Sequence, residues 1–299
     1  MSDGIEANLT AAVLARLEGV SDARFRQIMT SLIEHLHAFV RETELTEAEW
    51  FAGIEFLTAT GQKCDAKRQE YILLSDTLGV SMLVDAINHR KRTGATESTV
   101  LGPFYVRDAR DMPLGANIAN GVDGEPVYFS GEVLSADGTP IAGAKLDIWS
   151  TDGAGQYDVQ RPGGEQRARG RITTDAQGHY AFWTVKPVSY PIPTDGPVGM
   201  MLLKMGRHPY RPAHTHIIVS APGYEPVTTH LFVKGDPYLK SDAVFAVKDS
   251  LVVDFSPHHP GVAPDGKRVD QRWWTVQYDF GLPKASANRS QAVGHNAHT

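Results

Sequence analysis

The sequence is poor in cysteine, in long apolar runs and in positive charge. Its 299 residues contain one cysteine, Cys64, which excludes a disulfide within the chain and fits a reducing compartment. No apolar run is long enough to cross a bilayer, so we expect no membrane partner. The formal net charge of −6 argues against nucleic acid as a partner. The N-terminus is acidic and polar and does not resemble a secretory leader, so we predict a cytoplasmic protein.

What the sequence does contain is enough for a folded core, with 41% hydrophobic and 21% charged residues. Its first ninety or so residues have helical spacing. Apolar residues from Phe25 to Phe39 recur as on one face of a helix. Thr46 and Glu49 have the capping-box spacing, which predicts that another helix begins there. A third apolar pattern, from Tyr71 to Ile87, predicts helix on both sides of a break near Gly79.

From about residue 100 the pattern changes to short β-rich runs separated by turn residues. The expected strands are Val127–Leu134, Ala144–Trp149, Arg171–Thr174, Tyr180–Val185, His214–Ser220, Val227–Val233, Leu251–Phe255 and Trp273–Tyr278. Many short strands with turn punctuation are typical of an antiparallel β-sandwich. We therefore predict an α+β fold, with a helical N-terminal domain over 1–99, an antiparallel β-sandwich catalytic domain over 100–284, and a polar, flexible tail over 285–299.

The motif that points to chemistry is His214-Thr215-His216, at the head of the expected strand His214–Ser220. Side chains alternate faces along a strand, so both imidazoles point the same way and form half of a metal site. A histidine pair alone also fits ordinary strand residues. With His230 on the next strand, a three-histidine zinc hydrolase or hydratase is one alternative. A transthyretin-like sandwich that only binds or assembles is another.

Two tyrosines in loops offer a different ligand set. Tyr157 follows a glycine-rich turn, and Tyr190 lies in a proline-bounded segment. Most loop tyrosines only pack, and a phenol with a pKa of about 10 needs a strong Lewis acid to ionise at neutral pH. Fe(III) is such an acid. Two phenolates and two neutral imidazoles would leave it with one net positive charge, which suits an anionic substrate.

Three segments together resemble the intradiol ring-cleaving dioxygenases, which are non-haem Fe(III) enzymes. They are Leu101–Tyr105, the stretch from Asp147 through Asp158, and Gly206–His216, and the resemblance extends over most of the chain. It implies that Tyr157, Tyr190, His214 and His216 are the ligands of Fe(III). It also implies that Tyr190 acts as a base toward the substrate and that Arg211 stabilises negative charge on the ring.

Within this family, Ile72–His89 and Thr229–Phe245 resemble the members that open hydroxyquinol, benzene-1,2,4-triol. The implied reaction uses O2 to cleave the ring between adjacent hydroxyls, giving 3-hydroxy-cis,cis-muconate and then maleylacetate. The implied substrate contacts are Leu73, Asp76, Val100, Leu101, Gly102, Pro103, Phe104, Ile192, Pro193, Arg211, His230 and Val244. Chlorocatechol-cleaving relatives can share His230, so catechol or chlorocatechol is the alternative substrate.

Two further expectations accompany the resemblance. Asp76 is placed to accept a hydrogen bond from the third hydroxyl of hydroxyquinol, although an aspartate on a helix is more often exposed to solvent. The family dimerises through its N-terminal helices, often around a tunnel occupied by lipid. We therefore expect a homodimer formed by the helical domain of this chain.

Overall fold

The computed structural model describes residues 3–65, 68–90, 93–119 and 121–285. The predicted tail lies outside the described residues from position 286 on. The chain divides into two compact units, residues 1–59 and 60–299, which are described separately. Among the described residues, no helix is long and apolar enough to cross a membrane.

The first unit is helical, as predicted. It contains α1 (Asp3–Ala15), α2 (Ala23–Thr43) and most of α3 (Glu47–Gln62). The predicted capping box before α3 is present, since the backbone N–H of Thr46 donates to Glu49 at 3.0 Å and that of Glu49 donates to the Thr46 hydroxyl at 3.3 Å. None of the described residues of this unit is buried, so the apolar stripe of α2 is left exposed by the described part of its own unit.

The second unit begins with two short helices, α4 (Glu70–Thr77) and α5 (Val80–Asn88). The predicted break near Gly79 is confirmed, because Gly79 has a φ of 75° and starts α5. Glycine adopts this left-handed conformation without the steric cost that a side chain brings. A further helix, α6 (Pro197–Lys204), is inserted among the strands.

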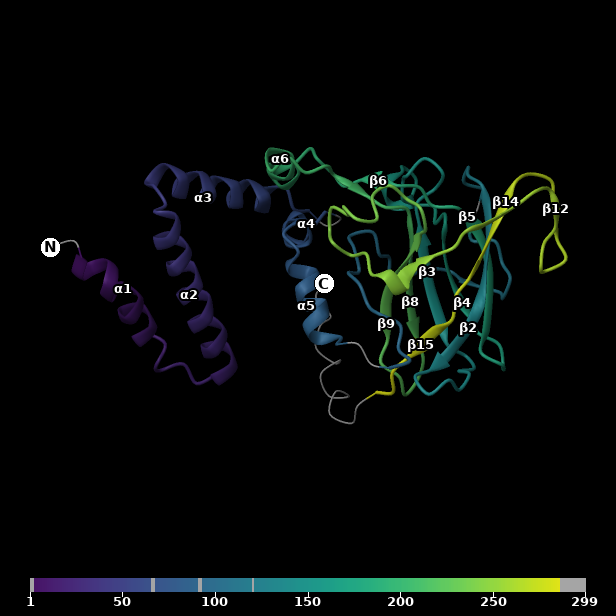
Figure 1. The fold of residues 1–299 in the computed structure, drawn as a ribbon, viewed down its shortest axis with the longest axis horizontal. Helices are drawn as coiled ribbons and strands as arrows, with labels where there is room; N and C mark the ends of the chain where they lie inside the picture. Colours follow the sequence, from purple (N-terminus) through teal and green to yellow (C-terminus); the bar gives the residue numbers. More distant parts are fainter. Residues whose placement is uncertain (1–2, 66–67, 91–92, 120, 286–299) are drawn as a thin grey trace. The chain divides into compact units, whose positions relative to one another are not determined.

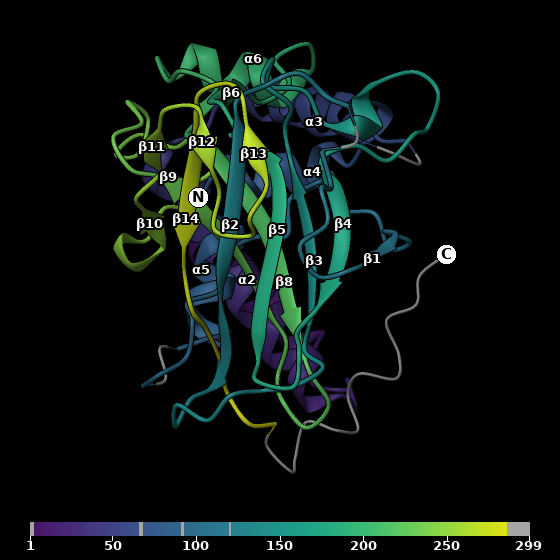
Figure 2. The same cartoon turned by 90° about the vertical axis from the view of Figure 1, so that its right-hand side faces the viewer.

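Two sheets of the second unit form the predicted sandwich (Figures 1 and 2). The first sheet has the order β1 (Asp111–Met112), β4 (Arg169–Thr173), β3 (Lys145–Ser150), β8 (His214–Ser220), β9 (Val227–Val233), β10 (Val252–Val253). The second has the order β11 (Ser256–His258), β14 (Trp273–Gln277), β2 (Pro126–Ser135), β15 (Phe280–Leu282), with β5 (His179–Val185) also paired to β2. Their facing sides form one apolar core whose members include the fully buried Phe129, Ile148, Phe182, Ile217 and Leu231. The remaining short elements are β6 (Tyr190–Pro191), β7 (Tyr210–Arg211), β12 (Gly261–Val262), β13 (Arg268–Val269) and two 3₁₀ turns, η1 (Asp158–Gln160) and η2 (Asp249–Leu251).

The sheets are mixed, which corrects the expectation of a purely antiparallel sandwich. β1 pairs with β4, β10 with β9, and both β14 and β15 with β2 in parallel. In each of these pairs the two strands are far apart in the sequence, so a long connection joins them. Parallel pairing requires such a connection, because a hairpin can join only antiparallel strands. The expected strand Leu251–Phe255 is also shorter than predicted. Leu251 ends the η2 turn, and only Val252–Val253 pairs as β10.

Candidate active site

The two histidines of β8 point the same way, as predicted from their spacing. Their Nε2 atoms are 3.1 Å apart, and both side chains are buried in the middle of the first sheet. Nδ1 of His214 lies 2.7 Å from the carbonyl oxygen of Pro212, and a carbonyl only accepts, so Nδ1 carries the proton and Nε2 keeps a free lone pair. Burial lowers the pKa of both His214 and His216 well below the usual value, so both imidazoles are neutral and able to bind a metal.

Tyr157 reaches these imidazoles from the loop after β3. The Asp152 carboxylate shapes this loop by accepting from the backbone N–H groups of Ala154 at 2.8 Å and Gln156 at 3.0 Å. The side chain of Gln160 then accepts from the backbone N–H of Tyr157 at 2.9 Å. The Tyr157 hydroxyl consequently lies 3.0 Å from Nε2 of His216 and 3.4 Å from Nε2 of His214.

Tyr190 arrives from the opposite side on β6, which pairs with β7 so that Tyr190 is opposite Arg211. Its hydroxyl lies 3.3 Å from that of Tyr157. The Tyr157 oxygen therefore lies 3.0–3.4 Å from the Tyr190 oxygen and from both imidazole nitrogens, which are themselves 3.1 Å apart. Metal–ligand bonds of about 2.0–2.2 Å place neighbouring ligand atoms roughly 3 Å apart, so this spacing fits one shared metal ion.

Ionisation of Tyr157 at this position would require a metal of high charge. Burial raises the pKa of Tyr157 well above its ordinary value, and the neighbouring Tyr190 raises it further. Without a metal, Tyr157 therefore remains a phenol at neutral pH. A strong Lewis acid is needed to displace its proton and to hold the resulting phenolate in this buried position.

His230 is a third buried imidazole beside this group. The metal-binding nitrogens of His214, His216 and His230 lie within 4.8 Å of one another, so a three-histidine site is geometrically available. Nδ1 of His230 hydrogen-bonds the Thr99 hydroxyl, and its Nε2 has no hydrogen-bond partner among the described residues. The Tyr157 hydroxyl nevertheless contacts His214 and His216, and the Tyr190 hydroxyl lies beside it, an arrangement that a three-histidine zinc site does not require.

Arg211 supplies a fixed positive charge at the same place. Its Nη1 lies 3.2 Å from Nε2 of His214, while its Nε and Nη2 donate to the two carboxylate oxygens of Asp242 at 3.1 and 3.4 Å. Burial alone would lower the pKa of Arg211, but the Asp242 carboxylate outweighs burial and the pKa is raised. The guanidinium therefore stays cationic although it is almost completely buried.

A cavity of about 680 Å³ opens beside this cluster and is large enough for a small aromatic ring. Its lining is Ile72, Ser75, Asp76, Ser81, Val84, Asp85, Asn88, His89, Val100, Leu101 and Gly102. Gly102 connects it to the cluster, because a Cβ there would lie 3.1 Å from Cε1 of His216. Asp76 is only 4% exposed, which rules out the alternative that it is an ordinary surface residue of a helix.

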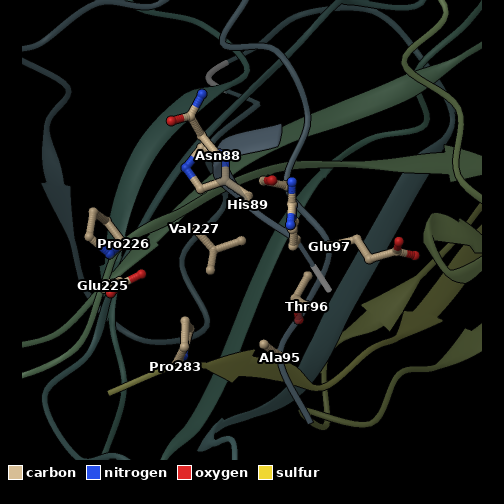
Figure 3. Close-up of a pocket in the computed structure, with 11 residues that line it drawn as sticks. Asn88, His89, Ala95, Thr96, Glu97, Glu225, Pro226, Val227 and Pro283 are labelled. Atoms are coloured by element: carbon tan, nitrogen blue, oxygen red, sulfur yellow. The ribbon is translucent and has the colours of Figure 1, made fainter. Parts of the chain in front are cut away.

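The other predicted substrate contacts are not part of this lining. Leu73, Ile192 and Val244 are buried, Pro193 is half-buried, and Pro103 is exposed. Phe104 stacks on the Tyr157 ring at 4.4 Å between centroids. Figure 3 shows a second cavity, which shares Asn88 and His89 with the first. With a volume of about 40 Å³ it is too small for a six-membered ring.

Comparison with known proteins agrees with this geometry. The dioxygenase family matches residues 100–283, and the catechol dioxygenase N-terminal family matches residues 22–96. A hydroxyquinol 1,2-dioxygenase of a Rhizobium species is 49% identical over 94% of this chain and 96% of its own length. A 6-chlorohydroxyquinol 1,2-dioxygenase of Cupriavidus pinatubonensis is 53% identical over 85% and 93%. The crystal structure of the hydroxyquinol 1,2-dioxygenase of Pseudomonas putida has 50% identity and a TM-score of 0.88 over 95% of this chain and 100% of that one.

The chain belongs to the intradiol ring-cleavage dioxygenases. The site of this intradiol dioxygenase also depends on residues that the sequence motifs did not indicate. Asp236 is one of them. Its Oδ2 accepts from the Ser189 hydroxyl at 2.8 Å and from the backbone N–H of Ala213 at 3.0 Å. One carboxylate thus joins the residues immediately before Tyr190 and His214.

A buried ion pair supports Tyr157 in the same way. Arg169 donates to both carboxylate oxygens of Asp158, at 2.8 and 2.7 Å, and both side chains are withdrawn from solvent. Nη2 of Arg169 also donates to the carbonyl of Phe104 at 2.8 Å. The dioxygenase therefore fixes the residue after Tyr157 and the residue stacked on its ring through one guanidinium. The position of Asp158 directly after a candidate ligand was the only signal in the sequence.

Proposed function

We propose that this intradiol dioxygenase uses Fe(III) and O2 to open hydroxyquinol to 3-hydroxy-cis,cis-muconate, which tautomerises to maleylacetate. The observation that carries the proposal is the convergence of two phenols and two neutral imidazoles beside a cavity that contains a buried carboxylate. The relatives named for hydroxyquinol cleavage support the substrate. The catechol or chlorocatechol alternative differs only in the ring that the cavity accepts.

Tyr157, Tyr190, His214 and His216 would hold the iron. When bound there, Fe(III) supplies a chelation site for two adjacent ring hydroxyls and draws electron density from the ring so that O2 attacks it. The two phenolates and two neutral imidazoles leave a net charge of one positive unit, which attracts a deprotonated diol. We propose that His230 contacts the substrate and does not bind the iron, because Tyr157, Tyr190, His214 and His216 already supply four ligands.

The other proposed roles follow from position and charge. Tyr190 pairs with Arg211 on the β6–β7 ladder, its hydroxyl lies beside that of Tyr157, and it would accept a proton from a substrate hydroxyl. The permanently cationic Arg211 stabilises negative charge that develops on the ring. Asp76 accepts a hydrogen bond from the third hydroxyl. Leu73, Val100, Leu101, Gly102, Pro103, Phe104, Ile192, Pro193 and Val244 shape the apolar walls.

We also propose a homodimer that forms through the N-terminal helices, with lipid bound between them, and a cytoplasmic location. We propose that function divides the chain as its sequence predicts, into a helical domain that forms the dimer (1–99), a catalytic domain (100–284) and a polar tail (285–299). The uncovered apolar stripe of α2 supports the dimer, because exposed apolar patches of this kind mark interaction surfaces.

The visible spectrum tests the metal assignment. Tyrosinate bound to Fe(III) absorbs visible light, so the purified protein should be coloured and should contain about one iron per chain. Tyr157→Phe and Tyr190→Phe each remove one phenolate, and each should weaken or shift the band strongly or lose the iron. Tyr180→Phe is the matched control, since Tyr180 is also fully buried but donates to the carbonyl of Tyr278 in the sandwich core.

The outcomes separate the competing functions. A colourless protein that carries zinc would favour the three-histidine hydrolase, and full colour and iron in both ligand variants would overturn the ligand assignment. Faster turnover of catechol than of hydroxyquinol by the wild type would transfer the proposal to a catechol-cleaving enzyme without changing the four ligands.

A further inference from the structure

The turn at residues 242–246, which includes the predicted substrate contact Val244, has an unusual backbone conformation. Phe245 has a φ of 59°, in the left-handed region that bulky side chains rarely adopt. Asp242 imposes this turn, because its carboxylate accepts from the backbone N–H groups of Val244 at 3.3 Å and Ala246 at 3.0 Å. Strained backbone of this kind persists where the surroundings over-determine it, often at functional sites.

The side chain of Phe245 is also unusually placed. It is 52% exposed, whereas Ala243, Val244 and Ala246 around it are buried. Its ring is covered on one side by the guanidinium of Arg207, whose central carbon lies 4.6 Å from the ring centroid. The same ring lies against the corner between α4 and α5, where a Cβ on Gly79 would be 3.5 Å from its Cδ2.

Arg207 contacts the same two regions with its donors. Nη1 donates to the carbonyl of Thr77 at 2.6 Å, at the end of α4, and Nη2 donates to the carbonyl of Ala243 at 2.9 Å. Thr77 follows Asp76 in the chain, and Ala243 precedes Val244. One guanidinium therefore joins the helix that carries Asp76 to the turn that carries Val244.

We propose that Arg207 and Phe245 together form a clip that fixes the spacing between the Asp76 wall and the Val244 wall, and that this spacing selects the ring. The inference rests on the proposed function, since it concerns the pocket in which hydroxyquinol would bind. The clip acts through its neighbours and contacts no substrate atom, so both members are positioning residues. A rigid spacing matters because a hydroxyl is recognised only when Asp76 lies within hydrogen-bond reach of it.

Arg207→Gln and Phe245→Ala test the clip in the iron-loaded enzyme. The ratio of kcat/KM for hydroxyquinol to that for catechol should fall about tenfold in each, with the loss concentrated in KM for hydroxyquinol. The visible band and the iron content should remain those of the wild type. Anaerobic titration, followed by the change in the visible band, gives the Kd of each diol without turnover and should show the same loss for hydroxyquinol.

Three further variants separate the clip from general destabilisation. Phe245→Tyr keeps the ring and should retain the wild-type ratio, and Lys240→Gln removes another charge from the same surface region and should also retain it. Phe245→Gly relieves the positive φ but removes the ring, so it should lose selectivity while melting no lower than Phe245→Ala. Because Phe245 is half exposed, these variants keep the test available if Arg207→Gln does not fold.

Failure of the clip and failure of the proposed function give different results. A wild type without the iron band, or without a preference for hydroxyquinol, overturns the proposed function. A wild type that prefers hydroxyquinol, with Arg207→Gln or Phe245→Ala folded, loaded with iron and unchanged in its ratio, overturns the clip alone.

Discussion

Asp76 is the single residue that we propose sets specificity in this site. Its side chain is almost fully buried on α4, where it hydrogen-bonds Ser81 and lies within the electrostatic influence of Arg211 and Asp242. Burial raises the pKa of Asp76, and the Ser81 hydrogen bond and Arg211 oppose part of this rise. Because burial disfavours its charged form, this carboxylate is suited to bind a ligand that donates a hydrogen bond to it.

We therefore expect Asp76→Ala to lose activity on hydroxyquinol and to change little on catechol. A hydrogen bond to a charged group contributes about 1.5–3 kcal/mol, which corresponds to a loss of roughly 10- to 100-fold in kcat/KM. Steady-state rates with both diols measure this difference. Because the pKa of Asp76 is raised, its proton binds at a higher pH than on an exposed aspartate, so the wild-type preference for hydroxyquinol should fall as the pH is lowered. Equal losses on both diols would show that Asp76 has only a structural role.

At the scale of elements, the sequence predicted those helix and strand boundaries that depend on interactions between residues near one another in the chain. The bounds of β8 and β9 are those predicted, the capping box begins α3, and Gly79 separates α4 from α5. Each of these signals depends on residues near one another in the chain. His214 and His216 could be proposed as ligands for the same reason, because they share one strand.

Contacts between distant segments could not be predicted in this way. The parallel pairing of β14 and β15 with β2 joins segments far apart in the chain. Asp236 joins the segments that precede Tyr190 and His214. Arg207 joins the end of α4 to the turn at residues 242–246. The two tyrosines could be proposed as ligands only through resemblance to a family, since a tyrosine in a loop carries no periodic signal.

The ion pair between η1 and β4 gives a prediction at this scale. Asp158→Ala would leave the Arg169 guanidinium buried without its carboxylate, and breaking a buried pair in this way costs about 3–5 kcal/mol. We expect a large fall in the free energy of unfolding, measured by denaturant titration, and a weaker or shifted visible band because η1 carries the residue after Tyr157. Glu165→Ala, which removes an exposed carboxylate that pairs with the half-buried Arg167, is the control and should change stability little. An unchanged band in a folded Asp158→Ala protein would show that the pair does not position Tyr157.

At the scale of the whole molecule, the exposed apolar surface of the first unit indicates a partner. Its helix α2 has exposed apolar side chains along one stripe: Phe25, Ile28, Leu32, Leu36 and Phe39. Leaving such side chains in water costs about 25 cal/mol for each Å² of apolar surface that another surface could cover. A second copy of the same unit can cover them, and twofold pairing is the commonest arrangement of soluble oligomers.

We expect the protein to be a dimer at micromolar concentration, with a mass by light scattering of twice the 32.7 kDa of one chain. Leu32→Glu places a charge in the centre of the α2 stripe and should shift the mass toward the monomer, because a charge is not readily buried in an apolar interface. Val262→Glu is the matched control, since Val262 is also an exposed apolar residue, on β12 of the second unit, and its substitution should leave the dimer intact. If the dimer forms through this unit, Leu32→Glu should also keep the iron band, because the four proposed ligands all belong to the second unit. A monomeric wild type, or a Leu32→Glu variant that stays dimeric, would show that the α2 stripe is not the dimer interface.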